Sequence, residues 1–169
     1  MKDFFERSEI IPVLQGFNPW WGGKPCAVPE FRRLAFEASR MYLQDTSLRR
    51  AILLSGPRRV GKTTILQQVA DALIKDGQDA KSILYLSLDH PLLKLLSLRE
   101  ILALYHESIY PEGRPVVLLL DEIQYAHGWE TEIKLLVDHQ PHYRILATYE
   151  AAAHCPATQR LPYALMCSI

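Results

Sequence analysis

The sequence contains few cysteines, and no two of them are close together. Only Cys26, Cys155 and Cys167 occur among 169 residues. An odd number without a C-x-x-C pair is not the pattern of a disulfide framework. A small secreted domain held together by disulfides is therefore excluded, and with 49% apolar residues the chain has enough material for one globular domain with its own core.

Long apolar runs are also missing. The run at 116–120 has five residues, whereas a membrane-spanning helix needs roughly 20. The first residues, Met-Lys-Asp-Phe-Phe-Glu-Arg, carry acids where a signal peptide has its apolar segment. We therefore expect a cytoplasmic protein without a membrane partner.

The chain has no net charge, because 19 basic residues balance 19 acidic ones. A protein that coats nucleic acid through its overall charge is therefore excluded. The charges are nevertheless uneven: residues 24–62 hold nine basic and three acidic side chains, and residues 65–150 hold seven basic and thirteen acidic ones. The basic segment has two open interpretations, solvated helix faces or a surface that meets a polyanion such as a nucleotide or a partner.

Residues 1–28 predict an extended N-terminal arm. They include Asn-Pro-Trp-Trp-Gly-Gly at 18–23 and further prolines at positions 12 and 25, a composition that breaks regular structure. Each tryptophan ring has about 200 Å² to bury. We therefore expect Trp20 and Trp21 to hold the arm against the domain or against another chain.

Between residues 29 and 148 apolar runs alternate with amphipathic stretches. Strands are predicted at 51–55, 83–88, 116–120 and 143–148, and helices near 29–43, 62–76, 97–106 and 129–137. Ser97 and Glu100 have the spacing of a capping box at the start of a helix. Because the strands are predominantly continuous apolar runs, we expect a parallel sheet covered on both faces, an α/β fold with ligands at the carboxyl ends of the strands.

A phosphate-binding loop follows the first predicted strand. Residues 56–64 fit the pattern G-x-x-x-x-G-K-[ST] between a strand and a helix. Backbone N–H groups of such a loop and of the helix N-terminus point at phosphate oxygens. Lys62 would reach the β- and γ-phosphates, and Thr63 would place its hydroxyl on Mg²⁺. The candidate nucleotide-binding residues of the loop are Gly56, Pro57, Arg58, Arg59, Val60, Gly61, Lys62, Thr63 and Thr64.

Arg58 and Arg59 have two open interpretations within this loop. Their guanidinium groups would either touch phosphate directly or lie in solvent. The loop itself predicts a P-loop NTPase, with the parallel sheet as the middle layer of a three-layer sandwich.

Two adjacent carboxylates end the third predicted strand. Asp121 and Glu122 follow the run at 116–120, which is the Walker B arrangement: the Asp holds the Mg²⁺ shell and the Glu polarises the attacking water. Glu122 has the alternative of a helix N-terminal carboxylate without a catalytic part. The predicted metal ligands are thus Thr63 and Asp121, and the predicted catalytic residues are Lys62 and Glu122.

Thr148 ends the fourth predicted strand, beside the Walker B strand. A polar side chain there would contact the γ-phosphate or orient the water. The alternative is that Thr148 has only a structural role, because threonine is common in strands.

Together these motifs resemble a known family. The resemblance is carried by Asn-Pro-Trp-Trp at 18–21, the loop at 56–64, Leu-Tyr-Leu-Ser-Leu-Asp at 84–89, Leu-Leu-Leu-Asp-Glu-Ile-Gln at 118–124, Gly-Trp-Glu at 128–130 and Ile-Lys at 133–134. The chain resembles the prokaryotic predicted ATPases of the AAA+ superfamily, in which an AAA domain precedes a C-terminal domain of unknown function. The resemblance implies ATP with Mg²⁺, Lys62 and Thr63 on the phosphates and metal, Asp121 and Glu122 as the Walker B pair, and Thr148 as the sensor.

The resemblance ends after Thr148. Residues 149–169 have no helical or strand period, and we expect a poorly ordered tail after an AAA+ core at 29–148 that is cut short behind its fourth strand. Codon degeneracy allows a shifted reading frame to encode a Ser/Gly-rich run at this point. A frameshift from about Tyr149 onward is therefore a hypothesis for the tail.

The leading functional interpretation is ATP binding, with Mg²⁺-dependent hydrolysis or an ATP-driven conformational switch that acts on an unidentified protein partner or a second copy. The alternative is a truncated, non-catalytic nucleotide-binding fragment. A small-molecule kinase is less favoured, because adjacent carboxylates suit water activation, and so is a nucleic-acid-binding module. Asn18 is the only asparagine, which excludes the N-K-x-D guanine reader of a GTPase.

Overall fold

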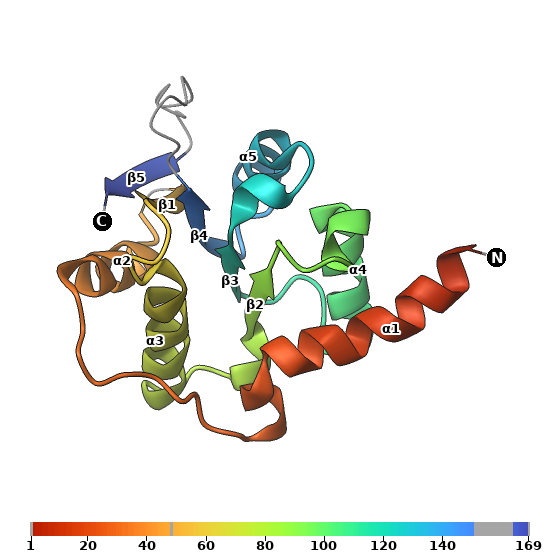
Figure 1. Ribbon diagram of the computed structural model, residues 1–169, viewed down its shortest axis with the longest axis horizontal. Helices are drawn as coiled ribbons and strands as arrows, with labels where there is room; N and C mark the ends of the chain where they lie inside the picture. Colours follow the sequence, from red (N-terminus) through yellow and green to blue (C-terminus); the bar gives the residue numbers. More distant parts are fainter. Residues whose placement is uncertain (1, 48, 151–163, 169) are drawn as a thin grey trace.

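Parallel strands form the centre of the computed structural model, which describes residues 2–47, 49–150 and 164–168 (Figure 1). In the described part of the chain the sheet has five strands in the order β2-β3-β4-β1-β5, and every neighbouring pair is parallel. The strands are β1 (Ala51–Gly56), β2 (Ile83–Ser87), β3 (Val116–Asp121), β4 (Tyr143–Glu150) and β5 (Ala164–Ser168).

Helices cover both faces of the sheet (Figure 1). The α-helices are α1 (Lys2–Phe17), α2 (Leu34–Gln44), α3 (Lys62–Lys75), α4 (Leu98–Ser108) and α5 (Trp129–His139). Short 3₁₀ helices are η1 (Pro19–Gly22), η2 (Ala80–Ser82), η3 (Leu93–Leu95) and η4 (Ile123–Tyr125).

Two apolar cores lie on opposite faces of the sheet. Leu118 and Leu120 of β3 pack with residues of α1, α4 and α5, whereas Val117 and Leu119 of the same strand pack with residues of α2 and α3. Successive strand residues point to opposite faces, so a strand with both faces covered is apolar throughout. The predicted α/β class and three-layer arrangement are confirmed.

The predicted extended arm at 1–28 is wrong for its first half. Residues Lys2–Phe17 form helix α1, with Pro12 inside the helix. Ile10 and Leu14 stand one turn apart on the face that packs into the core beside α4 and α5. The residues that break helices cluster from Gly16 onward, so the composition of the whole segment hid a helix in its N-terminal part.

The second half of the segment attaches to β2, as the two tryptophans predict. The Nε1 groups of Trp20 and Trp21 both donate to the carbonyl oxygen of Ile83, at 3.1 and 3.0 Å. Asn18 is buried and pairs with the backbone of Tyr85 in both directions: its Nδ2 donates to the Tyr85 carbonyl (2.9 Å), and the Tyr85 N–H donates to its Oδ1 (2.7 Å). This segment therefore packs on the domain itself.

The sheet extends beyond the fourth strand. A poorly ordered tail at 149–169 is predicted, yet β4 continues to Glu150 and Ala164–Ser168 forms β5 beside β1. For these residues the prediction is wrong. Hydrogen bonding to the open edge of β1 supplies order that the local sequence does not encode. The remainder of the predicted tail, 151–163 and Ile169, lies outside the described residues.

The predicted start of α4 is confirmed. The Ser97 Oγ accepts from the Glu100 N–H at 3.2 Å, and the Glu100 carboxylate accepts from the Ser97 N–H at 2.8 Å, which is a capping box. Among the described residues no helix combines the length and the apolar character needed to cross a membrane.

Candidate nucleotide-binding site

The predicted phosphate-binding loop joins the end of β1 to the start of α3. Gly61 is the N-cap of α3 and has a φ of 93°, a left-handed conformation that glycine adopts at no steric cost. Arg59 has a φ of 63°, which costs a non-glycine residue on the order of 1 kcal/mol. These two residues turn the chain tightly into α3, whose first N–H groups have no partner within the helix.

Lys62 points into this loop. The residue is 4% exposed, and its Nζ donates to the carbonyl oxygens of Gly56 (2.9 Å) and Pro57 (2.8 Å). A buried ammonium group needs acceptors, and here the loop's own carbonyls supply them. A phosphate in the loop would offer charged oxygens, which are stronger acceptors than carbonyls.

Asp121 collects three hydroxyl donors at the carboxyl end of β3. Thr63 Oγ1 and Tyr85 OH donate to its Oδ2 at 2.7 and 3.0 Å, and Thr148 Oγ1 donates to its Oδ1 at 2.5 Å. Asp121 is 3% exposed, so these bonds satisfy a carboxylate that has little access to water. The structure thus brings together the predicted metal ligands, Thr63 and Asp121, and the predicted sensor, Thr148.

Tyr85 is a member of this group that the sequence did not reveal. Burial, followed by the negative charge of Asp121 and the hydrogen bond to it, raises the pKa of Tyr85 far above its usual value. Its hydroxyl therefore stays protonated and remains a donor. A tyrosine inside a mostly apolar strand run is the available signal, because a buried tyrosine hydroxyl usually finds a polar partner.

Glu122 follows Asp121 in a left-handed conformation, with a φ of 54°. Its backbone N–H donates to Thr148 Oγ1 at 2.8 Å, and its Oε2 accepts from Gln124 Nε2 at 2.5 Å. Glu122 is the N-cap of η4 but makes no side-chain cap hydrogen bond. The contacts of the Glu122 side chain therefore do not support the alternative that this carboxylate only caps a helix.

Arg58 reaches across the mouth of the loop. Its Nε donates to Glu150 Oε2 at 2.9 Å and its Nη2 to Tyr125 OH at 3.0 Å, and the pair with Glu150 raises the pKa of Arg58. The arginine side chain is 64% exposed, so the stability gained is small. This guanidinium is largely exposed, as the solvent interpretation expects, and its two contacts tie the loop to the ends of β4 and η4.

Together these groups form one polar cluster at the carboxyl ends of β1, β3 and β4. The Lys62 ammonium group lies inside the loop, at the N-terminus of α3. The Thr63 hydroxyl lies beside the Asp121 carboxylate, and the Glu122 carboxylate follows in the next position of the chain. The chemistry that such a set allows is binding of a polyphosphate with a hard divalent cation, and activation of a water beside it.

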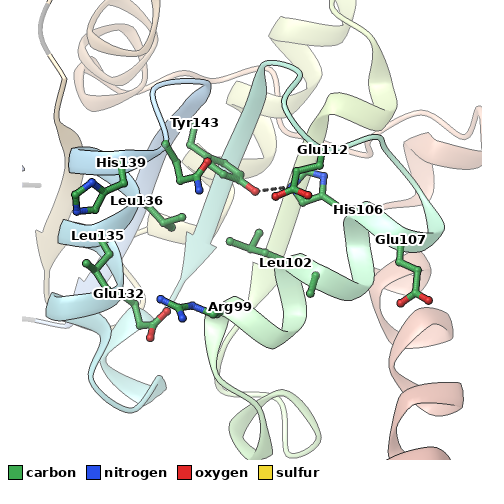
Figure 2. Close-up of a pocket in the computed structure, with 12 residues that line it drawn as sticks. Arg99, Leu102, His106, Glu107, Glu112, Glu132, Leu135, Leu136, His139 and Tyr143 are labelled. Carbon is green, nitrogen blue, oxygen red and sulfur yellow. Dashed lines mark hydrogen bonds between the residues drawn. The ribbon is translucent and has the colours of Figure 1, made fainter.

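A separate cavity of about 560 Å³ lies between α4 and α5 (Figure 2). His106 lines it and uses both ring nitrogens, Nδ1 with the carbonyl oxygen of Tyr110 and Nε2 with Tyr143 OH. Arg99, Glu132 and His139 also face this cavity. None of its lining residues belongs to the polar cluster around Asp121.

A family model described as an AAA domain matches residues 48–154. The matched segment contains the phosphate-binding loop, the carboxylates that end β3, and Thr148.

Two curated proteins and a solved structure are similar to the chain. An uncharacterized protein of Methanocaldococcus jannaschii is 39% identical over 92 residues, which is 52% of this chain and 19% of that protein. An uncharacterized protein of Haemophilus influenzae is 31% identical over 87 residues, covering 50% of this chain and 21% of that one. AMPPCP-bound DnaA from Aquifex aeolicus superposes with a TM-score of 0.53 at 21% identity, covering 90% of this chain and 51% of that chain. The chain thus spans about a fifth of these curated relatives and half of that structure, and the structural likeness shows the fold.

Proposed function

The chain belongs to the AAA domain family, and from that premise we propose that it binds ATP at the loop between β1 and α3 and hydrolyses it with the help of Mg²⁺. The observation that carries the proposal is the convergence of Thr63 and Thr148 on Asp121, with Glu122 in the next position. The AMPPCP bound to the structurally similar DnaA is an ATP analogue, which supports the choice of nucleotide.

In the proposed complex the loop N–H groups and the N-terminus of α3 hold the phosphates. Lys62 Nζ exchanges the carbonyls of Gly56 and Pro57 for β- and γ-phosphate oxygens. The cation is already buried within the loop, so the exchange needs a rotation of its side chain and no new burial. Val60 and Thr64 contribute backbone N–H groups of the loop and of the first turn of α3, whereas Pro57 has no N–H and contributes only by fixing the shape of the loop.

The oxygen donors present fit Mg²⁺, a hard cation that prefers carboxylate and hydroxyl ligands. Thr63 and Asp121 are the residues that would hold it, and they already lie within one hydrogen bond of each other. The ion, when bound, neutralises charge on the β- and γ-phosphates.

Glu122 is the proposed general base. It accepts a proton from water while the water oxygen forms a bond to the γ-phosphorus and the bond from that phosphorus to the bridging oxygen breaks, yielding ADP and inorganic phosphate. Thr148 is proposed to contact the γ-phosphate or to orient the water. Its hydroxyl already joins the backbone of Glu122 to the carboxylate of Asp121.

A measurement of ADP release tests the proposal. Glu122→Gln is expected to retain ATP binding and to lower turnover about 10²- to 10⁴-fold, the usual contribution of a general base. Glu107→Gln is the matched control, because Glu107 is exposed at the end of α4, away from the cluster. A wild-type protein that binds ATP without turning it over would leave only the non-catalytic nucleotide-binding function.

We also propose an unidentified protein partner or a second copy as the recipient of the conformational change, because AAA+ sites are often completed by a neighbouring subunit. Turnover per chain is then expected to rise with protein concentration. A cytoplasmic location remains a prediction from the sequence. A small-molecule kinase and a nucleic-acid-binding module remain the less favoured alternatives to this function.

A further inference from the structure

Gln124 contacts two different elements of the candidate site from one side-chain amide. Its Nε2 donates to Glu122 Oε2 at 2.5 Å, and its Oε1 accepts from the Glu150 N–H at 3.4 Å. The first contact is short and involves a carboxylate, whereas the second is long. The donor end of the amide therefore makes the stronger interaction.

The backbone of Glu122 is fixed independently of Gln124. Its N–H donates to Thr148 Oγ1, a fully buried hydroxyl that is itself bonded to Asp121. What remains to be set is the direction of the Glu122 carboxylate. Gln124 sets that direction by holding Oε2, which leaves Oε1 available to a water molecule.

A chain of contacts connects this amide to the phosphate-binding loop. Arg58, in the loop, pairs with the Glu150 carboxylate and donates to Tyr125 OH, and Tyr125 is the neighbour of Gln124 in η4. Both supports of the amide, its own short helix and the end of β4, are thus tied to the loop. In the sheet, β1 and β3 flank β4 on either side (Figure 1).

We propose that Gln124 is a positioning residue for ATP hydrolysis, which acts by donating a hydrogen bond to Glu122 and so aiming its free carboxylate oxygen at the attacking water. The inference rests on the proposed function. It assigns the amide donor, and not the amide acceptor, as the group that matters for the rate.

Three substitutions separate the donor from the acceptor. Gln124→Ala removes both, and we expect kcat to fall about tenfold, with KM for ATP changed by less than about twofold, because geometry is lost and ATP binding is not. Gln124→Glu keeps an oxygen that can accept from the Glu150 N–H but places a second carboxylate against Glu122. Its kcat is expected to be the lowest of the set. Gln124→Asn has the donor on a shorter side chain, and its kcat is expected to lie between those of Gln124→Ala and the wild type.

Gln140→Ala is the matched control, since Gln140 caps the far end of α5, and its kcat is expected to equal that of the wild type. Thermal unfolding of each variant shows whether a loss of rate comes from a loss of folded protein. If Gln124→Glu equals the wild type in kcat, or if kcat falls only in proportion to folded protein, the positioning role is refuted while the proposed function stands. If the wild type has no ATP turnover, both are refuted together.

Discussion

Replacing Thr148 by valine tests how the end of β4 supports the candidate site. Valine has the shape of threonine with a methyl group in place of the hydroxyl, so the change creates no cavity. It removes the bond that Thr148 Oγ1 donates to Asp121 (2.5 Å) and the bond that it accepts from the Glu122 N–H (2.8 Å). Thr148 is 0% exposed and Asp121 is 3% exposed, so water cannot easily replace the lost partner.

The expected cost follows from these two bonds. A buried polar group that loses its partner costs about 1–3 kcal/mol, and here both a carboxylate oxygen and a backbone N–H lose theirs. We therefore expect the free energy of unfolding to fall by about 3 kcal/mol in Thr148→Val. Thr148→Ser is the control, because it keeps the hydroxyl and loses one buried methyl group, worth about 1 kcal/mol.

Urea unfolding at neutral pH, followed by circular dichroism, gives the free energy of unfolding for the three proteins. The expected order of stability is wild type, Thr148→Ser, Thr148→Val. A valine variant that is as stable as the wild type would refute the reasoning, because it would show that the two hydrogen bonds at Thr148 contribute nothing.

Three further substitutions have definite expected outcomes in the same assay. Asn18→Ala leaves the Tyr85 N–H and carbonyl without their side-chain partner; we expect a loss of about 2–4 kcal/mol, and a loss below about 1 kcal/mol would contradict this. Tyr85→Phe removes only the hydroxyl donor to Asp121, and we expect a loss of about 1–2 kcal/mol; unchanged stability would show that two donors suffice. Burial, followed by the nearby His106, lowers the pKa of His142 below 6.5, so the unfolded chain takes up that proton first. Stability is then lost as the pH falls below 6.5 toward the lower pKa of the folded protein, and His142→Gln is expected to reduce this dependence; equal pH profiles for the two proteins would contradict it.

The elements that the sequence predicts well are those encoded by neighbouring residues. The strand runs of β1 to β4 are predominantly apolar because both faces of the sheet are covered, and in the loop before α3 a glycine, Gly61, occupies a position with a left-handed φ. The capping box of Ser97 and Glu100 needs only four consecutive residues. In each case the interaction is local, so its pattern is present in the sequence.

The features that escaped prediction depend on partners far away in the chain. Asn18 and Tyr85 are 67 residues apart, and Tyr85 in turn meets Asp121, 36 residues further on. Gln124 is close to Glu122 in sequence, but its second contact, at Glu150, exists only once β3 and β4 are adjacent. Strand β5 likewise depends on the open edge of β1. No local pattern specifies these pairings.

Calorimetric titration of the protein with ATP and Mg²⁺ tests the central claim most directly. The wild type is compared with Lys62→Ala, which removes the buried cation of the loop, and with Lys134→Ala, which removes an exposed lysine of α5. We expect saturable binding of equal affinity for the wild type and Lys134→Ala, and no measurable binding for Lys62→Ala. Binding of ATP by Lys62→Ala with wild-type affinity would contradict the claim that the loop between β1 and α3 is the nucleotide site.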